Sequence, residues 1–260
     1  MKFYKENLLE IVNTNNVNQL DFKDWIMFST DCEDNLKKWI RFKTCDYPDP
    51  DVVLKQGAPK CVAVKLNWYS DKETIDNYYI DCIFSFATFF KAFLRCYAGE
   101  YMPYMGQVYE NYEKIFSDKY KDEFCKKQDI NRACLDELLR QLNLFAKNTH
   151  TLGNYMKCPD GEYNAVKGNY FKYKDRLELL YQDVKGSSKE VSHWSSWFDK
   201  NKKELKIEEV LENEELLKFE FNGNKMKNKH FETYTKYIKN INEIIETRGI
   251  AFAKKLIETS

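Results

Sequence analysis

The sequence predicts a mainly α-helical protein, folded as a single compact multi-helix domain with at most one or two short extended elements. The chain has 260 residues but only 9 Gly and 5 Pro, so little interrupts a helix. Apolar residues recur at intervals of three and four along most of it. Hydrophobic residues make up 43% of the composition, which suffices for a sizeable core. We expect one domain over residues 1–260, which could divide into a helical lobe, 1–147, and a part with a motif loop and the C-terminal helices, 148–260.

The first third of the chain is expected to hold helices and one strand. Helical spacing covers Phe3–Val12 and Leu20–Phe28, and Asp31 is placed to cap a third helix in DCEDNLKKWIRFKT. Two prolines then exclude the helical conformation from the residues before them. After them, apolar and polar residues alternate in CVAVKLNWYS, which predicts a short strand or extended edge within residues 61–68.

A central helix is predicted next. Ser70 and Glu73 form a capping box, and the helix that follows, to Tyr97, is apolar on most of its circumference. Such a helix has to be buried on most sides. Asp81 and Ser85 are polar exceptions on it, and polar groups in such a place either find hydrogen-bond partners or line a site.

The remaining helices are predicted from their periodicity. GQVYENYEKIFSDKYKDEFCKK and NRACLDELLRQLNLFAKN are expected to form a helical pair. Further helices are expected at about 172–183 and in KIEEVLENEELLKF, and GSSKEVSHWSSWFDKNKKEL is expected to supply a loop and a helix. NGN at 222–224 predicts a turn. The last helix has a regular apolar seam that one arginine enters, made of Phe231, Tyr234, Ile238, Ile241, Ile245, Arg248, Phe252 and Leu256. The Arg248 guanidinium is either a structural group that needs a carboxylate or backbone acceptors, or a group that binds phosphate or substrate.

Composition favours a cytoplasmic protein. The 41 basic and 41 acidic side chains balance, so no overall field attracts a polyanion. The N-terminal residues do not form a signal peptide, and the most apolar run, CIFSFATFFKAFL, is too short for a membrane span. The eight cysteines are therefore expected to be reduced. None has the spacing of a zinc knuckle, and we expect no metal site, no cofactor and no membrane partner. The oligomeric state is left open.

The stretch HTLGNYMKCPDGEYNAVKGN, from His150 to Asn169, is the most distinctive in the chain. Gly153 is expected to adopt a backbone angle closed to other residues, and Asn154 to tolerate the left-handed region. Residues 155–158 are expected to be extended before a turn at Pro159 and Gly161. Cations and aromatic rings alternate here in a way that suits a surface that contacts nucleic acid, or a solvated face; they are Lys157, Lys167, Lys172, Lys174, Arg176, Tyr155, Tyr163, Tyr170, Phe171 and Tyr173.

This stretch resembles a motif, TIGNF…P…FN..RG, of a family of mostly helical bacterial proteins whose function is unknown. The match runs through Thr151, Gly153, Asn154, Pro159 and Asn164, and Lys167 stands where that family has arginine. The central helix, through Asp81, Phe84, Ser85, Phe86, Thr88 and Lys91, resembles a second motif of the same family.

The stretch is also distantly similar to the C-terminal part of HNH nucleases of modification-dependent restriction systems, which carry HRLGNLTLL and end in a helix with an arginine. That resemblance implies a setting in restriction or phage defence. A nuclease needs a histidine base and metal ligands. Here the segment before the motif has no histidine, so His150 is the only candidate catalytic residue nearby.

Three functions remain open. The first is a non-enzymatic binding protein with a polar cleft for a phosphate-bearing small ligand or nucleic acid, formed by Asp81, Ser85, Thr151, Asn154, Asn164, Lys167 and Arg248. The second is a metal-dependent nuclease or other phosphodiesterase in which His150 acts as the base. In the third, the motif is a structural corner of a protein-interaction module.

Overall fold

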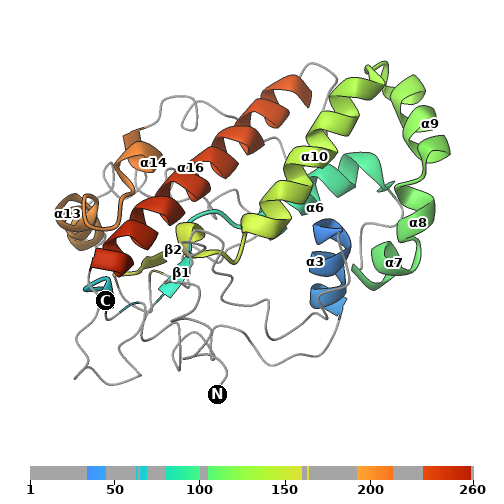
Figure 1. Cartoon of the computed structure of the whole chain (residues 1–260). Coiled ribbons are helices and arrows are strands. Elements are labelled where there is room, and N and C mark those ends of the chain that lie inside the picture. Colours follow the sequence, from blue (N-terminus) through green and yellow to red (C-terminus); the bar gives the residue numbers. More distant parts are fainter. Residues whose placement is uncertain are drawn as a thin grey trace.

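A computed structural model describes residues 34–44, 63, 65–68, 80–99, 105–159, 163, 192–212 and 231–258. This part of the chain holds nine α-helices, a 3-10 helix and a two-stranded sheet, which confirms the mainly α fold (Figure 1). The predictions at 3–12, 20–28 and 172–183, together with those for Asp31, Ser70, Glu73 and the NGN turn, lie outside the described residues.

The first described helix, α3 (Asn35–Thr44), begins three residues later than expected from a cap at Asp31. The carboxylate of Asp34 accepts a hydrogen bond from the backbone N–H of Lys37, at 3.1 Å, and so satisfies one of the N–H groups that the first helical turn leaves without a partner.

The strand predicted within residues 61–68 is wrong for the described residues there. Ala63 and Lys65 are helical, and the N–H of Trp68 bonds back to the carbonyl of Ala63 at 2.9 Å. Asn67 takes a positive φ of 62° and turns the chain. The turn lets Leu66 and Trp68 both be buried, so their spacing of two resembles strand alternation without a strand.

The second prediction that fails is the continuity of the central helix. Residues 80–82 form strand β1 (Ile80–Cys82), which pairs antiparallel with β2 (Tyr155–Lys157), so that Asp81 lies opposite Met156. The helix itself, α6 (Phe86–Tyr97), begins only after Ser85. The extended piece predicted at 155–158 is confirmed as β2.

Helix α6 is the centre of the core, as its composition predicts. Seven of its residues are buried. The Phe86 ring of α6 packs against Trp39 of α3, at 4.8 Å between ring centroids. It also packs against Phe145 of α10 (Arg132–Asn148), at 5.2 Å. The hydroxyl of Tyr234 donates to the Phe89 carbonyl at 2.6 Å and so ties α6 to the last helix, α16 (Phe231–Glu258).

The first member of the predicted helical pair is divided into three helices, α7 (Met105–Glu110), α8 (Tyr112–Ile115) and α9 (Asp118–Gln128). The Ser117 hydroxyl caps α9 by accepting from the Tyr120 N–H, and the Asn131 side chain caps α10 in the same way. Arg132 then holds α9 to α10, because it donates to Asp118 at 2.6 Å, to Asp136 at 3.0 Å and to Asp122.

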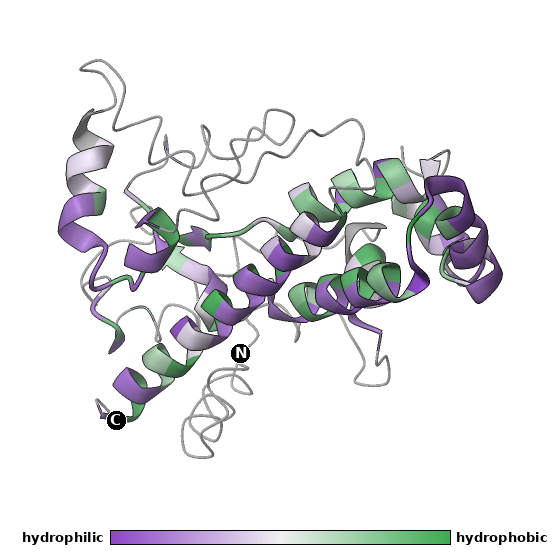
Figure 2. Ribbon diagram, turned by 90° about the horizontal axis from the view of Figure 1, so that it is seen from above, coloured by the Kyte–Doolittle hydropathy of each residue, from purple (hydrophilic) through white to green (hydrophobic). Residues whose placement is uncertain are grey.

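Helices α10 and α16 lie side by side along the molecule (Figure 1). The turn between α13 (Ser192–Asn201) and α14 (Glu208–Glu212) is joined to α16 through Arg248. Hydrophilic and hydrophobic residues alternate along α16 in Figure 2, in keeping with its buried seam. Gln141 and Asn242 join the two long helices through a buried side-chain hydrogen bond of 3.0 Å. Among the described helices, none is long and apolar enough to cross a membrane.

Candidate functional site

The HTLGN segment, residues 150–154, begins where α10 ends. The backbone N–H and the hydroxyl of Thr151 both donate to the Asn148 carbonyl, at 3.1 and 2.7 Å. Residues 152–154 then form the 3-10 helix η4 (Leu152–Asn154), which leads directly into β2. The segment therefore closes α10 and redirects the chain into the sheet.

The side chain of Asn154 completes the connection to the start of α6. It is fully buried, and its amide accepts from the Phe84 N–H at 3.0 Å and donates to the Phe84 carbonyl at 3.0 Å. It also donates to the Thr149 carbonyl at 2.7 Å. The backbone carbonyl of Asn154 accepts from the Ile83 N–H and so adds one hydrogen bond to the β1–β2 pairing. The side chain of the same asparagine satisfies three buried backbone groups.

Gly153 is required for a reason other than the one predicted. The described residues with positive φ are Asn67, Gly99, Asp129 and Lys206, so neither Gly153 nor Asn154 adopts the left-handed conformation. Instead, a Cβ at Gly153 would lie 1.8 Å from the backbone oxygen of Ile245 on α16. Glycine is needed because η4 packs directly on the backbone of the helix.

Arg248 follows this contact by one turn of α16 and is also buried, with 4% of its surface exposed. Its guanidinium donates only to backbone carbonyls among its described contacts. On one side these belong to Gly153 and, at 3.2 Å, to Tyr155. On the other side they belong to Leu205 at 2.8 Å and Lys206 at 2.9 Å. Of the two partners left open by the sequence, the structure therefore supplies backbone acceptors.

The two carbonyls at 205–206 lie in the turn that follows α13. The N–H of Ile207 bonds to the Lys202 carbonyl and the N–H of Lys206 to the Lys203 carbonyl, with Lys206 left-handed at φ 51°. These are the two bonds of a Schellman motif, which leaves the last carbonyls without partners. Arg248 provides those partners, and its positive charge lies at the negative end of the helix dipole.

Burial lowers the pKa of the Arg248 guanidinium to about 9, which still leaves it cationic at pH 7. The four carbonyl oxygens compensate for the water it has lost. The Phe252 ring, with its centroid 5.2 Å from the guanidinium carbon, adds a cation–π contact. Arg248 is thus a buried cation whose donors are directed at the protein's own backbone.

The structure brings together five of the predicted site residues, Asp81, Ser85, Thr151, Asn154 and Arg248, around the β1–β2 pair. All except Asp81 are buried. The half-buried Asp81 carboxylate accepts from the N–H of Cys82 at 2.7 Å.

The other predicted site residues are placed less closely or lie outside the described part. His150 is half-buried in the turn after α10, while Asn164 and Lys167 are outside the described residues. Of the predicted cation–aromatic surface, Tyr155 and Tyr163 are core residues, only 1% and 0% exposed, so they offer no face for stacking a base.

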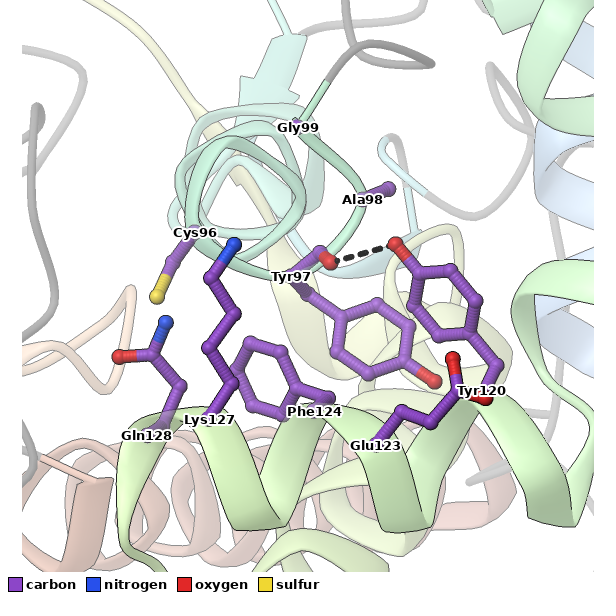
Figure 3. A pocket seen from close by; sticks show the side chains of 9 residues that line it. All are labelled: Cys96, Tyr97, Ala98, Gly99, Tyr120, Glu123, Phe124, Lys127 and Gln128. Carbon is purple, nitrogen blue, oxygen red and sulfur yellow. Dashed lines mark hydrogen bonds between the residues drawn. The ribbon is translucent and has the colours of Figure 1, made fainter.

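A pocket of about 420 Å³ lies elsewhere, between the C-terminal end of α6 and the face of α9 (Figure 3). None of the predicted site residues lines it. Its walls are Cys96, Tyr97, Ala98, Gly99, Tyr120, Glu123, Phe124, Lys127 and Gln128. The sequence signal that could have found it is the recurrence at i, i+4 of two polar residues, Glu123 and Lys127, beside two aromatic ones, Tyr120 and Phe124.

The floor of this pocket is aromatic. The Tyr97 ring contacts Phe124 at 4.9 Å and Tyr120 at 5.4 Å between centroids, both edge-on. The Tyr120 hydroxyl donates to the Tyr97 carbonyl at 3.0 Å, and the Tyr97 hydroxyl to the Ile115 carbonyl at 2.7 Å. Burial raises the pKa of Tyr97 well above its usual value, so the Tyr97 hydroxyl stays uncharged at any physiological pH.

Within the described part of the chain, no group of three or more His, Cys, Asp and Glu side chains is arranged to hold a metal ion. Comparisons of the chain with models of known protein families, with curated proteins and with solved structures find no match.

Proposed function

We propose that this protein is a non-enzymatic binding protein that takes a small organic ligand in the pocket between α6 and α9, and that the HTLGN segment is its structural centre. One observation carries the proposal. Glu123, Lys127 and Gln128 line the pocket, and none of their side chains makes a hydrogen bond or ion pair with another described residue. Polar groups without protein partners above an aromatic floor are what a ligand site provides.

The geometry of the HTLGN segment supports the structural half of the proposal. Binding a ligand requires donors and acceptors that are accessible. The side chains of Thr151, Asn154 and Arg248 instead satisfy buried backbone groups of this chain. A phosphate at Arg248 would have to displace the backbone carbonyls that the guanidinium caps on two chain segments, and each buried carbonyl left without a donor costs about 1–3 kcal/mol.

The composition of the pocket favours binding over catalysis. No histidine is among its described lining residues, and its one thiol, Cys96, has no histidine beside it in that lining to act as a base. The volume falls within the range of about 300–1,000 Å³ that is usual for small-molecule sites. The described lining of the pocket offers a polyanion such as nucleic acid a single lysine, Lys127, close to the carboxylate of Glu123.

A thermal-shift screen tests the proposal, with free amino acids, nucleotides, organic acids and amines, short DNA and RNA, and Mg²⁺ or Mn²⁺ as separate arms. A ligand at 100 times its Kd stabilises the folded protein by about 2.7 kcal/mol, which corresponds to about 5–11 °C in Tm. We expect such a shift for a small organic compound.

Two variants locate the site of binding. Lys127→Trp places an indole in the pocket, whereas Lys126, the preceding and also exposed residue of α9, does not line it, so Lys126→Trp is the control. The shift should vanish in Lys127→Trp and persist in Lys126→Trp. A ligand-induced shift in Tm that persists in Lys127→Trp would mean that the ligand binds elsewhere, and would refute the proposal. A shift caused only by Mg²⁺ or Mn²⁺, with cleavage of nucleic acid that His150→Ala abolishes, would favour the nuclease alternative.

A further inference from the structure

We infer that the ligand of the α6–α9 pocket is a zwitterion with an apolar side chain, such as a free amino acid, whose carboxylate is bound by Lys127 and whose ammonium group is bound by Glu123. This inference rests on the proposed function, because it names the class of molecule that the same pocket takes.

The first step is the pair of charges. Glu123 and Lys127 are four residues apart on α9, with the acidic residue nearer the N-terminus, which is the favoured arrangement for an ion pair on a helix. They nevertheless form no ion pair with each other or with another described residue. Figure 3 shows the Lys127 side chain extending toward Cys96 and the Glu123 side chain toward Tyr97 and Tyr120. The pocket thus presents a positive and a negative group on one face of α9.

The second step is the balance of charge. A phosphate or other dianion near Lys127 would be repelled by Glu123, and a simple cation near Glu123 would be repelled by Lys127. A ligand that carries both charges interacts favourably with both side chains at once. In an amino acid the ammonium and carboxylate groups are held on one carbon, short enough to lie between two side chains that are neighbours on one helix face.

The third step is the apolar surface beside the charges. Tyr97 and Phe124 are 2% and 6% exposed, so their rings form a floor that is packed closed from beneath. The half-buried Tyr120 completes this floor beside Glu123. An apolar side chain would lose water against these rings, and an ammonium group near Tyr120 would also gain a cation–π interaction. The Gln128 amide, beside Cys96 in Figure 3, offers a second donor to the carboxylate end.

Isothermal titration calorimetry at low salt tests the inference with three matched probes. L-phenylalanine carries both charges, 3-phenylpropionate lacks the ammonium group and 2-phenylethylamine lacks the carboxylate. L-leucine and L-tryptophan extend the series to other apolar side chains. We expect the amino acids to bind more tightly than either single-charge probe, by about two- to five-fold for each exposed charge contact.

The variants assign each charge to a residue. Lys127→Gln should weaken L-phenylalanine two- to five-fold, and should not weaken 2-phenylethylamine, which loses a repulsion. Glu123→Gln should likewise weaken L-phenylalanine two- to five-fold without weakening 3-phenylpropionate. Lys126→Gln, on an exposed residue outside the pocket, is the control and should change none of the three.

The outcomes separate the inference from the proposed function. Equal binding of all three phenyl probes, or tighter binding of a nucleotide than of any amino acid, overturns the zwitterion while the pocket remains a binding site. If no compound binds and Lys127→Trp changes nothing, both are refuted. Selective loss of the carboxylate contribution in Lys127→Gln, and of the ammonium contribution in Glu123→Gln, supports both.

Discussion

The contact between Gly153 and α16 gives a sharp prediction for one added methyl group. In Gly153→Ala the new Cβ would lie 1.8 Å from the Ile245 oxygen and 2.8 Å from the Gly249 nitrogen. Both are backbone atoms of a long helix, so no side chain can rotate away. Ordinary contact begins at 3.4 Å, so η4 must move from α16 by about 1.6 Å.

The energetic cost follows from what that movement breaks. Overpacking of this kind costs about 1–3 kcal/mol. The displaced Gly153 carbonyl also loses the Arg248 guanidinium, and a hydrogen bond to a charged group contributes about 1.5–3 kcal/mol. The free energy of unfolding should therefore fall by about 3–6 kcal/mol, and Tm by about 6–24 °C for a chain of about this length.

Two other glycines are the controls, and circular dichroism during heating and urea titration is the assay. At Gly106 in α7, a Cβ meets nothing within 4 Å, so Gly106→Ala should be neutral or stabilise by up to about 1 kcal/mol. At Gly99 the space is also open but φ is +50°, so Gly99→Ala should cost about 1–2 kcal/mol through backbone strain alone. A Tm for Gly153→Ala within 2 °C of the wild type, or above that of Gly99→Ala, would refute the close packing on α16.

Three further variants test the same centre and one surface group. Asn154→Ala removes the side-chain partners of three buried backbone groups of Phe84 and Thr149, and should lower the free energy of unfolding, measured in urea, by about 3–5 kcal/mol. A loss below about 1 kcal/mol would contradict these three hydrogen bonds. Arg248→Lys keeps the charge, but a lysine cannot reach carbonyls on both sides, so the free energy of unfolding should fall by at least about 2 kcal/mol. Equal stability would contradict the double cap, by which Arg248 donates both to the carbonyls at 153–155 and to those at 205–206. Hydrogen bonds from Arg140 and Gln141 lower the pKa of Glu137 to about 2, so its contribution is present above pH 4.5 and is lost as the pH falls toward 2. Because Glu137 is partly exposed, Glu137→Gln should cost only about 0.5–1 kcal/mol at pH 7 and nothing at pH 2, and a difference that persists at pH 2 would refute the charge effect.

The local part of this fold can be predicted from the sequence. The eight seam positions of α16, Arg248 included, are all buried, because helical periodicity depends only on neighbours three and four residues away. The caps at Ser117 and Asn131 are equally local. Strand β1 was missed since its pairing is not local. Asn154 and Phe84 are 70 residues apart, and an apolar run before a helix looks helical until its partner is known.

The candidate sites show the same division. The HTLGN segment stands out by composition, yet its role depends on acceptors that no spacing reveals. Arg248 reaches Gly153 and Lys206 from 95 and 42 residues away. The α6–α9 pocket was not predicted, because it forms where the end of one helix meets the face of another and because its residues are ordinary ones on an amphipathic helix.

The double cap by Arg248 has a consequence for how the native structure opens. The guanidinium is the common partner of η4, of the 202–206 turn and of the middle of α16, so none of these can leave without removing hydrogen bonds from the other two. In native-state hydrogen exchange, amides of segments this far apart in sequence usually report separate openings, each with its own free energy. Here the three should exchange together as one cooperative unit, and Arg248→Lys should split that unit into parts that exchange at different rates.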